Sequence, residues 1–211
     1  MKFLDLESQY KRMEQEIQSG INNVLSHGKY IMGPEVIELE EKLSKFTGTK
    51  YCISCASGTD ALLMPLMAFD IGPGDAVLTT PFTFIATAEV IQLLGATPIF
   101  VDIEGDNFNI CPDKLEQKIK ENESKNELNL KAVIPVDLFG LPSNLVQIEN
   151  IATKYNLKLI VDSAQGFGAT INDKKSCSFG DVGATSFFPA KPLGCYGDGG
   201  AIFTDDEDLY K

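Results

Sequence analysis

The stretch LKAVIPVDLFGLPSNLVQIENIATKYNLKLIVDSA, residues 130–164, decides the fold. It opens with an apolar run (LKAVIPVD), continues with apolar residues at helical spacing (SNLVQIENIATKYN) and closes with a second apolar run (LKLIVDSA). Parallel strands that helices cover on both faces are near-continuous apolar runs, and a crossover helix joins each to the next. The stretch therefore predicts a strand–helix–strand unit.

The same alternation extends in both directions from this unit. Three more strand-like runs precede it, each followed by a helical pattern, and two short ones follow it: YCISCAS, AVLTTP and TPIFVD, then ATSFFPAK and GGAIFTD. We expect an α/β fold with a mostly parallel sheet and helices on both faces. Residues 1–48 are predicted to form an N-terminal helical segment and residues 49–211 one large domain, with a polar surface loop over residues 121–129.

Composition limits the classes of partner. The chain has 211 residues, of which 44% are hydrophobic, and a net charge of −12. Such a charge disfavours binding to nucleic acid or to an anionic membrane through bulk electrostatics. The sequence shows no apolar run long enough for a membrane span and no apolar signal core at its start, so we expect a cytoplasmic protein.

The cysteines do not suggest a disulfide or metal framework. There are five, and the one close pair, Cys52 and Cys55, lies in a predicted strand, where the two side chains would face opposite sides. A zinc site would need a second such pair. We interpret these two as buried small hydrophobic residues and predict no metal, with a C-x-x-C redox protein as the alternative.

Residues that follow the strands are the candidates for a binding site, because ligands of such sheets lie beyond the carboxyl ends of the strands. After the first strand, SGTDAL places Gly58 at a helix start, where free N–H groups favour an anion such as phosphate; an ordinary helix cap is the alternative. After the second strand, Phe82 and Phe84 could stack on a flat cofactor or simply pack in the core.

Two aspartates end later strands. Asp162 ends an apolar strand and should be buried, which requires a cationic or strongly donating partner, and Gln165 could present its amide to the same place. Capping of the next helix is the alternative for Asp162. Asp137 has the simpler interpretation of a turn-forming or capping residue.

Lys191 is the one charged side chain between Gly183 and Gly197. Pro192 favours an extended or turn conformation for it, and a desolvated lysine becomes a usable amine nucleophile. The alternative is an exposed loop lysine. Taken together, a phosphate cradle, a flat ring, a buried aspartate and a secluded lysine are what pyridoxal phosphate requires: a Schiff-base lysine, an acidic partner for the pyridine nitrogen and an anion site.

The motifs SGTDAL, VDSAQ-FGA and SFFPAKPLGCYGDGGAIFT, with YIMGPEV near the start, resemble the DegT/StrS family of nucleotide-sugar aminotransferases. The resemblance covers essentially the whole chain and implies the large domain of a fold-type-I pyridoxal 5′-phosphate (PLP) transferase. By resemblance, Lys191 is the Schiff-base lysine and Asp162 pairs with the pyridine nitrogen. The other cofactor-binding residues it implies are Gln165 and Phe84 on the two ring faces, and Gly58, Thr59 and Ser186 at the phosphate.

The resemblance also implies an activity. The family moves an amino group from an amino acid, by habit glutamate, to a keto group of a nucleotide-linked sugar, and the PLGCYGDGGA version is most similar to enzymes that aminate C3 of UDP-linked 3-keto-uronic acids for surface polysaccharides. It further implies a homodimer and a small C-terminal domain that this chain lacks, so we expect a fragment of a longer enzyme. The alternatives are a non-catalytic PLP-binding fragment and a PLP-dependent sugar dehydratase, in which the lysine is typically replaced by histidine.

Overall fold

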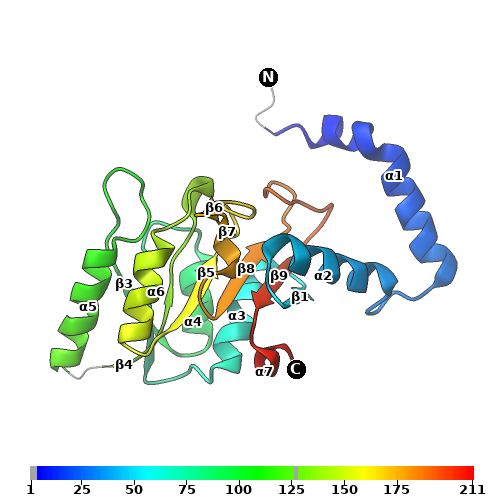
Figure 1. Ribbon diagram of the computed structural model, residues 1–211. Coiled ribbons are helices and arrows are strands. Elements are labelled where there is room, and N and C mark those ends of the chain that lie inside the picture. Colours follow the sequence, from blue (N-terminus) through cyan, green and yellow to red (C-terminus); the bar gives the residue numbers. More distant parts are fainter. Residues whose placement is uncertain (1–3, 126–127) are drawn as a thin grey trace.

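The computed structural model describes residues 4–125 and 128–211 (Figure 1). Residues 1–3 of the predicted N-terminal segment and residues 126–127 of the predicted polar loop lie outside the described residues. A seven-stranded sheet forms the centre, in the order β1-β9-β8-β5-β4-β2-β3. Its strands are β1 (Tyr51–Cys55), β2 (Asp75–Thr79), β3 (Thr97–Phe100), β4 (Asn129–Ile134), β5 (Lys158–Asp162), β8 (Val182–Ser186) and β9 (Gly200–Thr204).

The sheet is mostly parallel, as predicted. From β3 through β2, β4 and β5 to β8, each neighbouring pair is parallel, whereas β9 runs antiparallel to both β8 and β1. In β5 the register places Asp162 opposite Ala184 of β8. The carboxyl ends of these parallel strands therefore share one edge of the sheet.

Helices cover both faces of the sheet, which confirms the second part of the prediction (Figure 1). Buried residues of α3 (Gly58–Ala68) and α4 (Ala86–Leu93) pack in one core cluster with Ile134 and Ile160. Buried residues of α5 (Pro112–Lys125) and α6 (Leu145–Lys154) pack in a second cluster with Val133 and Val161. Consecutive strand residues thus point into different cores, which explains why the strands are continuous apolar runs.

Two local features differ from the sequence prediction. The polar loop begins later than residue 121, because α5 continues to Lys125, and the buried Asn122 donates its side-chain amide to the carbonyl oxygen of Leu128 at 2.8 Å. A two-stranded hairpin, β6 (Thr170–Ile171) with β7 (Lys174–Lys175), was not predicted. Asn172 and Asp173 form its turn with φ of 49° and 63°, a conformation that these two residue types tolerate better than most.

The N-terminal helices differ in how they contact the body. Helix α2 (Pro34–Thr47) packs Leu43 beside Cys52 and Phe203, whereas no side chain of α1 (Leu6–His27), all of it described, is buried, and α1 extends away from the sheet (Figure 1). The chain ends in the short helix α7 (Glu207–Tyr210), and two 3₁₀ turns, η1 (Leu138–Gly140) and η2 (Ser176–Ser178), lie between strands. Among the described residues, no helix is both long and apolar enough to cross a membrane.

The prediction that Cys52 and Cys55 are buried small hydrophobic residues is confirmed for Cys52 and only partly for Cys55, which is half-buried. All five are free in the described part of the chain; Cys52 is buried and Cys55 is half-buried. The two belong to different core clusters, as opposite faces of a strand require. Burial raises the pKa of the Cys52 thiol to about 12 and that of Cys55 to about 11, so both stay protonated at neutral pH. The described residues contain no group of three or more His, Cys, Asp or Glu side chains arranged to hold a metal ion.

Candidate active site

The start of α3 and the end of β8 are packed closely enough to exclude a side chain between them. A Cβ built on Gly58 would lie 2.5 Å from Cβ of Ser186 and 2.9 Å from its Oγ, so glycine is required at this point. Gly200, the register partner of Ser186, is crowded in the same way against the carbonyl oxygen of Ser57. The first turn of α3 is thereby held against the ends of two strands.

This arrangement forms a candidate anion cradle. Ser57 caps α3, with its Oγ accepting a hydrogen bond from the N–H of Asp60 at 3.1 Å, so the helix-cap alternative for this motif is also correct. Cap and cradle are compatible, since the N–H groups of a helix start favour an anion. Thr59 is half-buried beside Gly58, and Ser186 is nearly buried opposite. The structure thus brings together the three residues predicted for phosphate.

Asp162 ends β5 with only 5% of its surface exposed, which confirms the predicted burial. Its Oδ2 accepts a hydrogen bond from Oγ1 of Thr87 at 2.9 Å and its Oδ1 one from the N–H of Ala164 at 3.1 Å. Burial raises the pKa of Asp162, while these two hydrogen bonds and the positive charge of Lys191 act in the opposite direction. A buried carboxylate in this state favours a further cationic partner.

Thr87 is a site residue that the sequence reasoning missed. It lies on α4, is fully buried, and shares a 2.9 Å hydrogen bond with Thr83 in addition to its bond to Asp162. The available signal was a hydroxyl among the apolar residues of the helix that follows the strand AVLTTP. Its spatial partner is too distant in the sequence for spacing to identify it.

Lys191 lies in the loop that joins β8 to β9. The loop folds back on itself: the N–H of Lys191 donates to the carbonyl oxygen of Phe188 at 2.8 Å, and the N–H of Cys195 to that of Phe187 at 2.7 Å. Lys191 is half-buried rather than fully secluded, because Pro192 and Leu193 beside it are exposed. Its positive charge lowers the pKa of the buried Asp162, as the smallest of the influences on that carboxyl.

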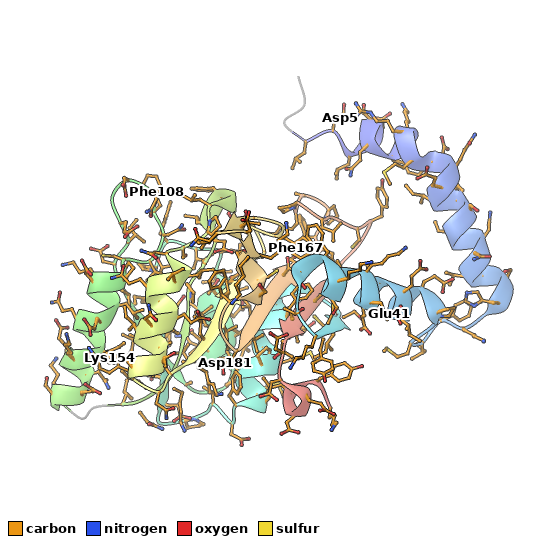
Figure 2. All side chains as sticks on the ribbon, in the orientation of Figure 1. Asp5, Glu41, Phe108, Lys154, Phe167 and Asp181 are labelled. Atoms are coloured by element: carbon orange, nitrogen blue, oxygen red, sulfur yellow. The ribbon has the colours of Figure 1, made fainter. Side chains whose placement is uncertain are left out.

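The two residues predicted for the faces of a flat ring, Gln165 and Phe84, follow β5 and β2 in the chain. Gln165, half-buried in the turn after β5, accepts a hydrogen bond on Oε1 from the N–H of Phe139 at 2.9 Å. Phe84 is 64% exposed and Phe82 is 44% exposed, so the alternative that they are core residues is wrong. Phe82 contacts Phe108, at 5.6 Å between ring centroids, and Phe139, at 6.2 Å. Phe108 lies in a loop on this side of the molecule (Figure 2).

The prediction that Asp137 forms a turn is confirmed, because its carbonyl oxygen accepts a hydrogen bond from the N–H of Gly140 at 3.3 Å, but the capping alternative is wrong for its side chain. The 3₁₀ turn that it precedes has no side-chain cap, and its fully buried carboxylate binds residues of other segments instead. Burial, with a smaller contribution from the charge of Asp162, raises its pKa to about 6.

These residues fit a PLP molecule. The cofactor requires an amine, an acidic partner and an anion site. Here these are the amine of Lys191, the buried carboxylate of Asp162 and the helix start at Gly58. Each of these three groups also occurs in proteins without PLP, and it is their combination in one chain that fits the cofactor.

Comparisons with known proteins identify the family. The DegT/DnrJ/EryC1/StrS aminotransferase family model matches residues 11–211. The chain is 51% identical over 209 residues to UDP-2-acetamido-2-deoxy-3-oxo-D-glucuronate aminotransferase of Pseudomonas aeruginosa, covering 99% of this chain and 56% of the relative. The chain therefore spans about half the length of the curated relatives it matches.

Solved structures agree with the sequence comparison. A DegT DnrJ EryC1 StrS aminotransferase from Brucella abortus superimposes with a TM-score of 0.98 at 50% identity, over 100% of this chain and 56% of that one. A Bacillus subtilis protein solved with bound cofactor PMP superimposes with a TM-score of 0.84 at 35% identity, over 95% of this chain and 43% of that one. Because the family model, the sequence relative and these folds agree over nearly every residue, the chain belongs to the DegT/DnrJ/EryC1/StrS aminotransferase family.

Proposed function

We propose that this chain is the cofactor-binding large domain, residues 49–211 with the helical segment 1–48, of a PLP-dependent sugar aminotransferase. The substrate we propose is a UDP-linked sugar with a keto group at C3, of the 3-oxo-uronic acid class named for the Pseudomonas relative, with glutamate as amino donor. The product would serve surface polysaccharide synthesis. The observation that carries the proposal is the buried Asp162 at the end of β5, beside the strand β8 whose end packs against Gly58.

The cofactor, when bound, supplies an aldehyde that captures amines and a ring that takes up an electron pair. Lys191 would hold the cofactor through its Nζ, and the same amine would accept and return a proton at the reacting carbon. Gly58, Thr59 and Ser186 would hold the phosphate at the start of α3. Gln165 and Phe84 would lie against the two faces of the ring.

Asp162 would keep a proton on the pyridine nitrogen. Because burial raises its pKa, the carboxylate charge is costly in the cofactor-free site, and a protonated ring nitrogen beside it would offset that cost. Thr87 and the N–H of Ala164 each bond one oxygen and thereby orient the carboxylate. The burial that makes an unpartnered charge on Asp162 unfavourable therefore favours a cationic ring beside it.

We further propose that the enzyme is cytoplasmic and a homodimer. Support for the dimer comes from exposed apolar side chains of the N-terminal segment, among them Ile21, Leu25, Ile31 and Ile37, since clustered exposed apolar residues mark interaction surfaces.

The test is an absorption spectrum of the purified chain with PLP. We expect a band near the visible edge that glutamate shifts and a 3-keto nucleotide sugar restores. Lys191→Ala should lose the band, while Lys114→Ala, which changes an exposed lysine on α5, should keep it. A wild-type chain with no such band, or a band that survives in Lys191→Ala, would sink the proposal.

A further inference from the structure

Asp137 is a buried carboxylate to which the mechanism above gives no task. Its side chain accepts a hydrogen bond on Oδ1 from the N–H of Ser143 at 3.1 Å and one on Oδ2 from Oγ of Ser163 at 2.8 Å. The two donors come from separate segments, the loop before α6 and the turn after β5. One carboxylate thus ties that loop to that turn.

The turn that Asp137 holds is the one that carries the site residues. Ser163 directly follows Asp162, and Gly166 directly follows Gln165. A Cβ on Gly166 would lie 2.5 Å from Cβ of Asp137, so the turn is seated directly on this side chain. Ser163 and Ser176 lie 3.3 Å apart between their Oγ atoms, which extends the contact to η2.

The backbone places Asp137 and Asp162 in fixed register beside each other. The N–H of Asp137 donates to the carbonyl oxygen of Asp162 at 3.0 Å, and the N–H of Asp162 donates to that of Pro135 at 2.9 Å. The sheet therefore sets the position of Asp162, but its carboxylate takes one hydrogen bond from Ala164 inside the turn. The orientation of that carboxylate depends on the turn, and the turn depends on Asp137.

We propose that Asp137 is a positioning residue, whose ionised carboxylate holds the turn Ser163–Gly166 from below so that Asp162 and Gln165 face the cofactor. The inference rests on the proposed function. Because Asp137 is fully buried, we assign its action to its contacts with Ser163 and Gly166 rather than to the cofactor or the substrate.

The protonation state of Asp137 changes within a pH range in which binding can be measured. Burial is the main reason that its pKa is raised to about 6, and the facing titratable groups are Asp162 on β5 and Cys177 on η2. The amine of Lys175, on the neighbouring β7, instead donates to the carbonyl oxygen of Gly168 at 2.9 Å. When Asp137 takes a proton, one oxygen becomes a donor, and the hydroxyl groups of Ser163 and Ser176 have to reorient.

The experiment compares Asp137→Asn with Asp181→Asn in the full chain. Asp181 is a matched control, because its carboxylate accepts from the N–H of Leu159 at 2.8 Å and so caps β5 at the end away from the site (Figure 2). The dissociation constant for PLP is measured by absorbance from pH 5 to pH 8. The free energy of unfolding of the cofactor-free protein is measured at pH 8. We expect a wild-type constant that rises as pH falls through about 6, about tenfold weaker binding for Asp137→Asn at pH 8, and a smaller pH dependence in that variant, in which only the phosphate of PLP and the other site groups still titrate.

Asp181→Asn is expected to keep the wild-type constant and its pH dependence, whatever it does to stability. Ser163→Ala, which removes only the hydroxyl partner, should reproduce part of the loss and serves in place of Asp137→Asn if that variant does not fold. If Asp137→Asn has the same PLP dissociation constant and the same pH dependence as wild type, this inference is wrong while the proposed function stands. The same result in Ser163→Ala has this meaning if only that variant folds. A wild-type chain that does not bind PLP at all overturns the proposed function and this inference with it.

Discussion

Substituting Gly58 by alanine tests whether the close packing of α3 against β8 makes the anion cradle. The added Cβ would lie 2.5 Å from Cβ of Ser186, whereas two carbon atoms in favourable contact lie about 3.5–4.0 Å apart. The start of α3 must therefore move by roughly 1 Å, because the obstructing atom is attached directly to the backbone of β8 and has no rotamer that relieves the contact. Gly58 does not have a positive φ, so strain of the backbone itself does not contribute.

The expected magnitudes follow from this displacement. Overpacking costs about 1–3 kcal/mol, and the lower entropy of an unfolded alanine offsets about 0.4–1 kcal/mol, so we expect a net loss of about 1–2 kcal/mol in the free energy of unfolding. Moving the N–H groups by roughly 1 Å should break one charge-assisted hydrogen bond to the phosphate, worth about 1.5–3 kcal/mol, which weakens PLP binding about 10- to 100-fold.

The assay is urea unfolding of the cofactor-free chain together with a PLP titration by absorbance. Gly72→Ala is the control, because its Cβ would meet only the carbonyl oxygen of Leu94 at 3.8 Å, an ordinary contact. Adding Ser186→Gly should cost less stability in the Gly58→Ala background than in wild type, since it removes the obstructing atom. If Gly58→Ala matches Gly72→Ala in both stability and PLP affinity, the cradle does not depend on this packing.

Three further predictions concern single side chains. Lys191→Ala should leave no cofactor fixed to the protein after borohydride reduction, seen by mass spectrometry, while the unfolding midpoint stays within a few degrees of wild type; a fixed cofactor would place the attachment on another lysine. Asp162→Asn should abolish turnover yet leave the cofactor-free chain at least as stable as wild type at pH 8, because burial raises the pKa of Asp162 and its charge there opposes folding; a large loss of stability in urea would contradict this. Asp137, whose pKa rises from 3.8 unfolded to about 6 folded, should contribute about 3 kcal/mol of stability that is complete below pH 3.8 and lost as pH rises through about 6; urea unfolding between pH 4 and 7 should show this slope in wild type and not in Asp137→Asn.

Much of the fold could be predicted because burial on both faces leaves a direct trace in the sequence. Strands such as Lys158–Asp162 are apolar without alternation, and each is followed by a helix with one apolar face. The hairpin β6–β7 left no such trace, since two-residue strands are too short for a period and its turn residues also suit a loop. The extension of α5 to Lys125 was missed because polar residues near a helix end resemble a polar loop.

Candidate residues could be predicted one by one, but their contacts could not. Lys191, Asp162 and Gly58 each stood out from their neighbours through charge, burial or position after a strand, and the structure confirms the burial of Asp162 and the close packing at Gly58. Thr87 and Asp137 did not stand out, because their importance comes from partners on other strands and helices. Spacing along a chain carries no information about such contacts; for Asp137 it predicted the local turn but not the partners of its side chain.

The pairing of β1 with β9 has a consequence for the order of folding. β1 comes early in the chain at Tyr51–Cys55, and within the described residues its sheet partner is β9 at Gly200–Thr204. During synthesis β1 therefore has no strand partner until β9 has left the ribosome. Bringing the two strands together closes a loop of most of this sequence, which is slow. The contacts of Gly58 with Ser186 and of Ser57 with Gly200 span the same interval. The packing around Gly58 is thus among the last features to assemble, and a chain that has not yet added β9 lacks the contact that holds the start of α3 against Gly200.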